Sequence, residues 1–133
     1  DDRDDRIGQH RQAVREGRSV AATLGQGATA ENAAAARRSV WGSVGLVIGA
    51  TVGTAVQDLE LDLATMNGPL LAPGIGAQGG TAADVRRVFA GALPQVLPSS
   101  SRAVLAAGPQ VARLATAARD ESARMAEIVR SAG

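Results

Sequence analysis

Residues 70–102 constrain the fold of this chain most strongly, because two short apolar runs in this segment each lead into a polar loop. The first run, residues 70–72, is followed by Pro-Gly and a glycine-rich loop, and a helix is predicted to start at Thr81. The second run, residues 96–97, leads into three serines and an arginine at residues 99–102. Strands that end in loops rich in hydrogen-bond donors are typical of phosphate-binding α/β proteins. The segment therefore predicts strand–loop–helix units and a phosphate ligand.

Helical and strand-like patterns alternate along the rest of the chain. Residues 19–38 are predicted to form an alanine-rich helix, which Ser19 caps and a pair of arginines closes. A break in this helix is expected near Gly25 and Gly27, because glycine costs about 1 kcal/mol relative to alanine inside a helix. Residues 45–51 form a continuous aliphatic run, which predicts a strand buried on both faces of a parallel sheet.

The following segments repeat this order. We expect a loop and a short helix in residues 51–58 and a helical piece or connector in residues 59–67. Two further strands are expected in residues 70–73 and 95–98, and another helical turn opens at residues 99–102. The chain therefore predicts one helix followed by three strand–helix units.

The helix that starts at Thr81 carries a predicted capping arrangement with Asp84. Arg86 and Arg87 are expected on its solvent side, and Pro94 ends the unit. Its apolar face is made of Val85, Val88 and Phe89. The last helix has an apolar stripe at intervals of three and four residues, which predicts core packing. This stripe consists of Val111, Leu114, Ala118, Met125, Ile128 and Val129.

The alternation predicts an α/β fold, with parallel strands joined through helices by right-handed crossovers. At 133 residues the chain fits one domain or part of a larger one. About three strands cannot close a barrel of eight, so the strands form either an open sheet or part of a barrel. We expect residues 19–133 to form this unit, and residues 1–18 to be a charged, solvated lead-in that is frayed or partly helical.

Composition excludes several classes of function. The chain has no cysteine, no lysine and a single histidine, His10 in the charged lead-in. Disulfides, thiolate nucleophiles, cysteine-ligated metals and two-histidine metal motifs are therefore excluded. A net charge of +1 and 2% aromatic residues lack the basic stripe with interleaved aromatics that nucleic-acid binding needs. The longest apolar run, residues 44–56, is too short to span a membrane, and the acidic start is unlike a secretory signal, so we expect a cytoplasmic protein.

The two loops carry the chemistry that the sequence predicts. Glycines let a backbone approach an anion closely, Gln78 adds a neutral donor, and Arg102 offers a fork suited to phosphate. In eight-stranded barrels a phosphate site recurs in the loops after strands seven and eight. If the last two strands take those places, Gln78 and Arg102 would converge on one anion. The alternative is an ordinary tight turn, with a helix-capping serine and a surface arginine. Acid–base groups are few, and a catalytic triad would have to recruit His10.

Three segments resemble, in order and spacing, the C-terminal part of orotidine 5′-phosphate decarboxylase, most closely the bacterial subgroup with longer chains. The segments are GSVGLVIGAT, GPLLAPGIGAQGG and VLPSSSRAVLAAGP, at residues 42–51, 68–80 and 96–109, and APGIGAQGG is the most specific part. The resemblance covers roughly residues 19–118. It implies barrel strands six to eight of a TIM (β/α)8 barrel, in a lyase of pyrimidine (UMP) biosynthesis that works as a homodimer without metal or cofactor.

The resemblance also implies roles for five residues. Gln78 matches the glutamine that grips the substrate phosphate, and Arg102 matches the arginine that pairs with it. The amides of Gly79, Ser101 and Arg102 would complete the grip, and Pro73 would lie near the pyrimidine. The family's catalytic Asp-Lys-Asp group lies on earlier strands, and a chain without lysine cannot contain it. No catalytic residue is therefore expected in this chain, and its expected partners are orotidine 5′-phosphate or UMP and the missing N-terminal half of the barrel.

Two other hypotheses remain open at the level of sequence. The first is a non-catalytic phosphate- or nucleotide-binding half-barrel, or a structural fragment, whose exposed sheet edges would favour self-association. The second is a different phosphate-binding barrel enzyme, although such an enzyme should lack the APGIGAQGG run.

Overall fold

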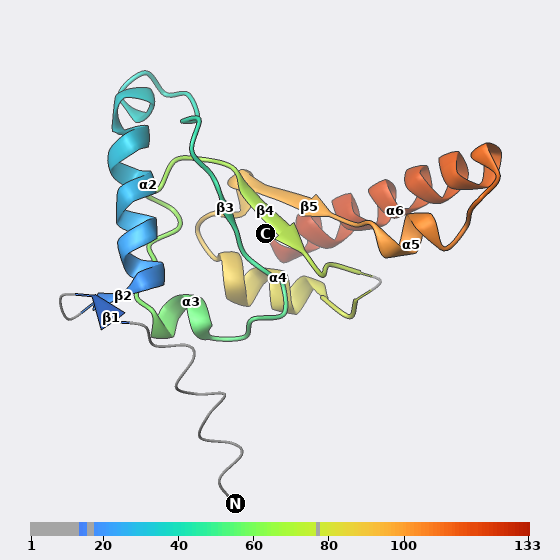
Figure 1. The fold of residues 1–133 in the computed structure, drawn as a ribbon, viewed down its shortest axis with the longest axis horizontal. Helices are drawn as coiled ribbons and strands as arrows, with labels where there is room; N and C mark the ends of the chain where they lie inside the picture. The colour runs from blue at the N-terminus through green and yellow to red at the C-terminus, as the bar shows by residue number, and fades with distance from the viewer. Residues whose placement is uncertain (1–13, 16–17, 77) are drawn as a thin grey trace, which may run out of the picture.

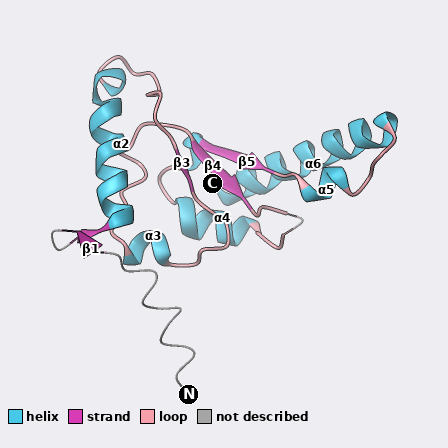
Figure 2. Ribbon diagram, in the orientation of Figure 1, coloured by secondary structure: helices cyan, strands magenta, loops and turns pink. Residues whose placement is uncertain are grey.

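The computed structural model describes residues 14–15, 18–76 and 78–133, and Figure 1 shows their fold. The strands are β1 (Val14–Arg15), β2 (Arg18–Ser19), β3 (Leu46–Val47), β4 (Leu70–Pro73) and β5 (Val96–Ser99). The helices are α2 (Val20–Ala36), α3 (Ala55–Asp58), α4 (Ala82–Phe89), α5 (Arg102–Leu105) and α6 (Val111–Ala132), with a 3₁₀ turn at Leu93–Gln95. Figure 2 colours the same view by these classes. No helix among the described residues is both long and apolar enough to cross a membrane.

The central sheet is parallel, in the order β3-β4-β5, and each strand leads into a helical segment. The α/β class, the parallel strands and the succession of one helix and three strand–helix units are therefore confirmed. The strand at residues 70–73 has its predicted bounds, whereas β5 begins one residue later than expected, because Gln95 ends the 3₁₀ turn. Residues 59–67 form turns and no helix, so this segment is the connector.

Only one face of this sheet is packed. Leu70 and Ala72 point into the core, while Leu71 between them is 41% exposed. The register places Val47 beside Leu71 and Leu71 beside Leu97, and these two neighbours are 68% and 43% exposed. The prediction of a strand buried on both faces is wrong for β3, because no described residue covers the face that carries Val47. An apolar sheet face therefore remains open.

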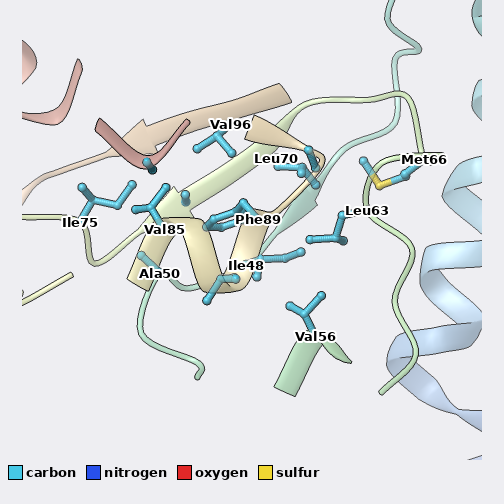
Figure 3. Packing of buried hydrophobic residues seen from close by; sticks show 14 of the residues in the cluster. Ile48, Ala50, Val56, Leu63, Met66, Leu70, Ile75, Val85, Phe89 and Val96 are labelled. Atoms are coloured by element: carbon cyan, nitrogen blue, oxygen red, sulfur yellow. The ribbon is translucent and has the colours of Figure 1, made fainter. Parts of the chain in front are cut away.

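The core lies between the sheet and α4 (Figure 3). Val85, Val88 and Phe89 of α4 are fully buried, as their spacing predicted. The predicted cap is present: the Asp84 amide donates to Thr81 Oγ1 at 3.2 Å, and the Thr81 amide donates to Asp84 Oδ2 at 2.9 Å. A helix of only eight residues is thus fixed at its start by its own side chains and held along its length by burial.

The C-terminal half of α6 packs on α4 and on this core, and Met125 is buried there. The predicted core packing of the apolar stripe of α6 is therefore confirmed around Met125. It is wrong in the first half of the helix, where Val111 is 81% exposed and Ala118 is exposed. In Figure 1 the first half of α6 extends away from the body, beside α5. Arg86 is exposed, but its guanidinium also donates to the Ala132 and Ser131 carbonyls at 2.9 and 2.8 Å, and so satisfies the end of α6.

The first long helix, α2, runs without a break from Val20 to Ala36, so the interruption expected near Gly25 and Gly27 is wrong. The predicted cap is confirmed, since the Ala22 amide donates to Ser19 Oγ at 3.0 Å. A Cβ added at Gly25 would lie 3.1 Å from Leu61 Cδ2. Close packing of this side chain against the helix offsets part of the cost of a glycine.

Asn32 of α2 joins the helix to the starts of two strand segments. Its amide nitrogen donates to the Val44 carbonyl at 2.8 Å and to the Met66 carbonyl at 3.0 Å, and its oxygen accepts from the Val44 amide at 3.1 Å. The side chain is buried, and a Cβ at either Gly42 or Gly68 would overlap it. Two glycines therefore make room for one amide that satisfies three backbone groups, a role that no sequence pattern indicated.

The described part of the charged lead-in is a pair of two-residue antiparallel strands, β1 and β2. These residues were expected to be frayed or helical, so the expectation is wrong for residues 14–15 and 18. His10 lies outside the described residues.

Candidate phosphate-binding site

The two loops that were predicted to bind phosphate leave the same edge of the sheet. β4 and β5 are parallel neighbours, and their register pairs the last residues, Pro73 and Ser99. The loop of residues 74–80 follows the first strand, and residues 100–102 follow the second. Figure 1 shows both arrowheads pointing the same way, towards α5. The structure therefore places Pro73, half-buried, directly beside the beginning of the serine segment.

The loop after β4 is closed by its own backbone. The Gly76 amide donates to the Gly80 carbonyl at 2.8 Å, and the Gly80 amide donates to the Gly74 carbonyl at 3.0 Å. Gly74, Gly76 and Gly79 have φ angles of 91°, 75° and 92°. Side chains other than glycine rarely adopt these angles, so the glycine content is first a requirement of this turn.

The loop offers fewer free amides than the sequence suggested. The Gly79 amide donates to the Gly76 carbonyl at 2.8 Å, and the amides of Thr81 and Asp84 belong to the capping box of α4. The Asp84 carboxylate also brings a negative charge to this helix start. Its pKa is lowered by hydrogen bonds from Thr81 and by Arg87, which keeps it ionised at neutral pH. Gln78 is exposed at the turn, and its side chain makes no hydrogen bond to any described residue.

The loop after β5 is more open to a ligand. Ser101 is the residue before α5 and is exposed, and its hydroxyl makes no capping hydrogen bond. Arg102, the first residue of α5, is also exposed. Within the described ranges the Arg102 guanidinium makes no hydrogen bond and no ion pair. The donors most available at this edge are therefore this guanidinium and the neighbouring hydroxyl, which suit a phosphate.

A buried carboxylate lies behind the two loops. Glu121 of α6 accepts from Arg124 Nε at 3.0 Å and pairs with Arg124 Nη2 as well. Hydrogen bonding from Arg124 lowers the pKa of Glu121, burial opposes this shift, and the Ser100 hydroxyl and the charge of Arg124 lower it further. Glu121 Oε1 is nevertheless buried without a partner in hydrogen-bonding geometry among the described residues.

Sequence reasoning missed Glu121, although a signal was present. The residue lies three positions after Ala118 and four before Met125, so it falls within the apolar stripe of α6. Arg124 follows it at the spacing of an i,i+3 ion pair. A charged residue inside an apolar stripe, with an opposite charge at this spacing, indicates a buried carboxylate held by an ion pair.

Acid should destabilise the chain partly through Glu121. Because its folded pKa lies below the ordinary value of 4.5, its stabilising effect is complete above that value and is lost as pH falls through the folded pKa. Urea unfolding between about pH 7 and pH 3 should show a steeper loss of unfolding free energy for the unaltered chain than for Glu121→Gln. Asp84 contributes to both proteins alike. Equal slopes would contradict the assignment.

Metal binding has no obvious place in the described part of the chain, where no group of three or more histidine, aspartate or glutamate side chains could hold an ion.

Curated proteins and a solved structure are similar to this chain. No protein-family model matches the chain. Curated proteins named orotidine 5′-phosphate decarboxylase match it at 65% identity over 77 residues in Salinispora arenicola, and at 52% over 112 residues in Streptomyces coelicolor. These alignments cover 58% and 84% of this chain but only 26% and 38% of the relatives. The chain therefore spans between a quarter and two fifths of the length of these relatives.

A solved structure shows the same likeness in three dimensions. This structure, from Streptomyces avermitilis and provisionally named orotidine 5′-phosphate decarboxylase, matches 90% of this chain at 49% identity with a TM-score of 0.69. The match covers 39% of the solved chain. The α/β arrangement of parallel strands and helices is thus the arrangement of part of that protein. Over the portion that it spans, this chain is homologous to proteins named orotidine 5′-phosphate decarboxylase.

Proposed function

We propose that this chain is the phosphate-binding, C-terminal portion of an orotidine 5′-phosphate decarboxylase, the lyase that converts orotidine 5′-phosphate to UMP and CO₂. In this proposal residues 19–133 are strands six to eight of a (β/α)8 barrel. The observation that carries the proposal is the pairing of Pro73 with Ser99, which brings both predicted loops to one sheet edge. The names of the relatives supply the substrate.

The proposed grip assigns a role to each site residue. Arg102 pairs with the phosphate, and its exposed guanidinium, which has no partner in the described part of the chain, supports this role. Gln78 and the Ser101 amide contact the same phosphate from the two sides, and Pro73 lies near the pyrimidine. The Gly79 amide would contribute only after releasing the Gly76 carbonyl, so phosphate binding through it requires a change in the loop.

A phosphate grip contributes to decarboxylation without touching the bond that breaks. Binding energy from a remote, non-reacting group can be used to orient and desolvate the reacting centre. The residues that act on the carboxylate belong, in this proposal, to the part of the enzyme outside this chain, because the family's Asp-Lys-Asp group needs a lysine and the sequence has none. The chain alone should therefore bind the nucleotide but not turn it over.

Calorimetric titration with UMP tests the grip. Arg102→Ala should weaken UMP binding by about 10- to 100-fold, as expected for loss of hydrogen bonds to a charged group. Arg38→Ala is the matched control, because Arg38 is an exposed arginine just beyond the end of α2, and α2 and α5 lie on opposite sides of the molecule in Figure 1. Uridine, which lacks the phosphate, should bind the unaltered chain and Arg102→Ala equally. Equal UMP affinity in the two arginine variants would contradict the proposed site.

A second candidate, a nucleotide-binding half-barrel without catalysis, is favoured by the open sheet face around Val47. Loss of UMP binding in Arg102→Ala supports both candidates. Absence of UMP binding by the unaltered chain would leave only a structural fragment.

A further inference from the structure

One ion pair of α6 reaches both loops of the proposed grip. Arg124 lies against the loop after β4: a Cβ added at Gly76 would be 2.8 Å from its Cζ and Nη2 atoms. The same helix packs against β5 and α5, the elements before and after the second loop, and the Ser100 hydroxyl there lowers the pKa of Glu121, the partner of Arg124. One helix, α6, therefore lies beside both loops, outside the sheet.

The burial of Glu121 calls for an explanation beyond stability, since its partner Arg124 is exposed. Glu121 is only 7% exposed, and a carboxylate withdrawn from water needs a partner that compensates for its lost hydration. Apolar residues of similar volume in such a place are often neutral or stabilising. A second pair on the same helix, Glu127 with Arg130, has the same i,i+3 spacing but is exposed to solvent. Burial is thus not a general property of the ion pairs of α6.

The contacts of each partner indicate what this pair does. Gly76 has no side chain, and this lets the guanidinium of Arg124 lie directly on the loop backbone. Glu121 Oε2 accepts from this guanidinium, while Oε1 is buried and has no hydrogen-bond partner among the described residues, so the carboxylate has capacity for another donor. A shift of either loop would change the environment of the same carboxylate.

We propose that the Glu121–Arg124 pair positions the loops after β4 and β5 relative to one another for phosphate binding. This inference rests on the proposed function and deepens it, because it adds two residues that touch no substrate but hold those that do. Removing the carboxylate charge releases Arg124 from its partner, and the loop at Gly76 then loses its fixed distance from Ser100. The distance between the phosphate donors Gln78 and Arg102 is then no longer fixed.

Titration with UMP separates positioning from general stability. Glu121→Gln, close in shape but uncharged, should bind UMP about tenfold more weakly, the lower end of the losses seen when residues that orient ligands are changed. Glu127→Gln, at the same spacing on the same helix, should bind UMP as the unaltered chain does. In amide NMR spectra, Gly79 and Ser101 should both shift in Glu121→Gln and remain in place in Glu127→Gln.

A double variant keeps the test decisive if the single change unfolds the chain. Glu121→Met with Arg124→Met removes the pair and leaves no buried charge alone, so stability should be retained while UMP affinity still falls. Unchanged UMP affinity in this folded double variant would overturn the positioning role and leave the proposed function intact. If the unaltered chain fails to bind UMP, both the positioning role and the proposed function are overturned.

Discussion

Orotidine 5′-phosphate should be decarboxylated when this chain is combined with the rest of a relative, and by neither part alone. The rest is the part of the Streptomyces coelicolor protein outside its 112 aligned residues, which make up 38% of that protein. UMP formation should exceed the sum of the separate parts by at least about a hundredfold, a small fraction of a typical enzymatic acceleration. The measurement is the loss of the orotate absorbance, with both parts at equal concentration.

The open sheet face is the physical reason to expect this assembly. Val47, Leu71 and Leu97 lie side by side across three strands and are all partly exposed. Apolar surface of this kind is buried when further elements pack on it, at roughly 25 cal/mol per Å². Leu71→Glu should therefore prevent assembly and turnover, while Val20→Glu, at an exposed apolar residue of α2, should leave both unchanged. Turnover by this chain alone would contradict the proposal that the catalytic residues lie outside this chain.

Asn32→Ala should lower the free energy of unfolding by about 3 kcal/mol or more, because each buried backbone group left without a partner costs about 1–3 kcal/mol. The change leaves the Val44 amide, the Val44 carbonyl and the Met66 carbonyl without the side chain that satisfies them. Urea unfolding followed by circular dichroism measures the loss. Glu31→Ala, at the exposed neighbouring position of the same helix, should change the stability by less than about 0.5 kcal/mol.

A second variant tests the same joint from the opposite side. In Gly42→Ala the new Cβ would lie 2.0 Å from Asn32 Oδ1, so the amide would have to move out of its hydrogen bonds. We expect a destabilisation comparable to that of Asn32→Ala, and little further loss when both changes are combined, because they break the same contacts. Additive losses would show that Asn32 and Gly42 act independently.

Local signals in the sequence predicted the elements whose stability is local. The bounds of β4 and the cap formed by Thr81 and Asp84 were correct, because glycine, proline and capping residues act within a few positions of the chain. The interruption of α2 at Gly25 was predicted wrongly for the opposite reason. Leu61, 36 positions away, packs on that glycine, and helix propensity alone does not register such a contact.

The exposure of Val47 could not have been predicted from the segment that contains it. A continuous aliphatic run indicates a strand that is buried on both faces, but no described residue covers the second face. Asn32 was missed because its partners lie 12 and 34 positions away. In the candidate site, the order of elements was enough to predict that both loops leave the same edge of the sheet. The hydrogen bond from the Gly79 amide to the Gly76 carbonyl could not be predicted, because it depends on how the turn closes in three dimensions.

The buried carboxylate of α6 also fixes where that helix can lie along the sheet. A slide by one turn, about 5.4 Å, would carry Glu121 away from Ser100 and bring a charge against apolar side chains such as those near Met125. An all-apolar stripe would tolerate such a slide, since one aliphatic side chain replaces another with little loss. Glu121 therefore marks a single axial register for α6, and the Arg86 bonds to the last carbonyls of the helix hold the same register from its other end.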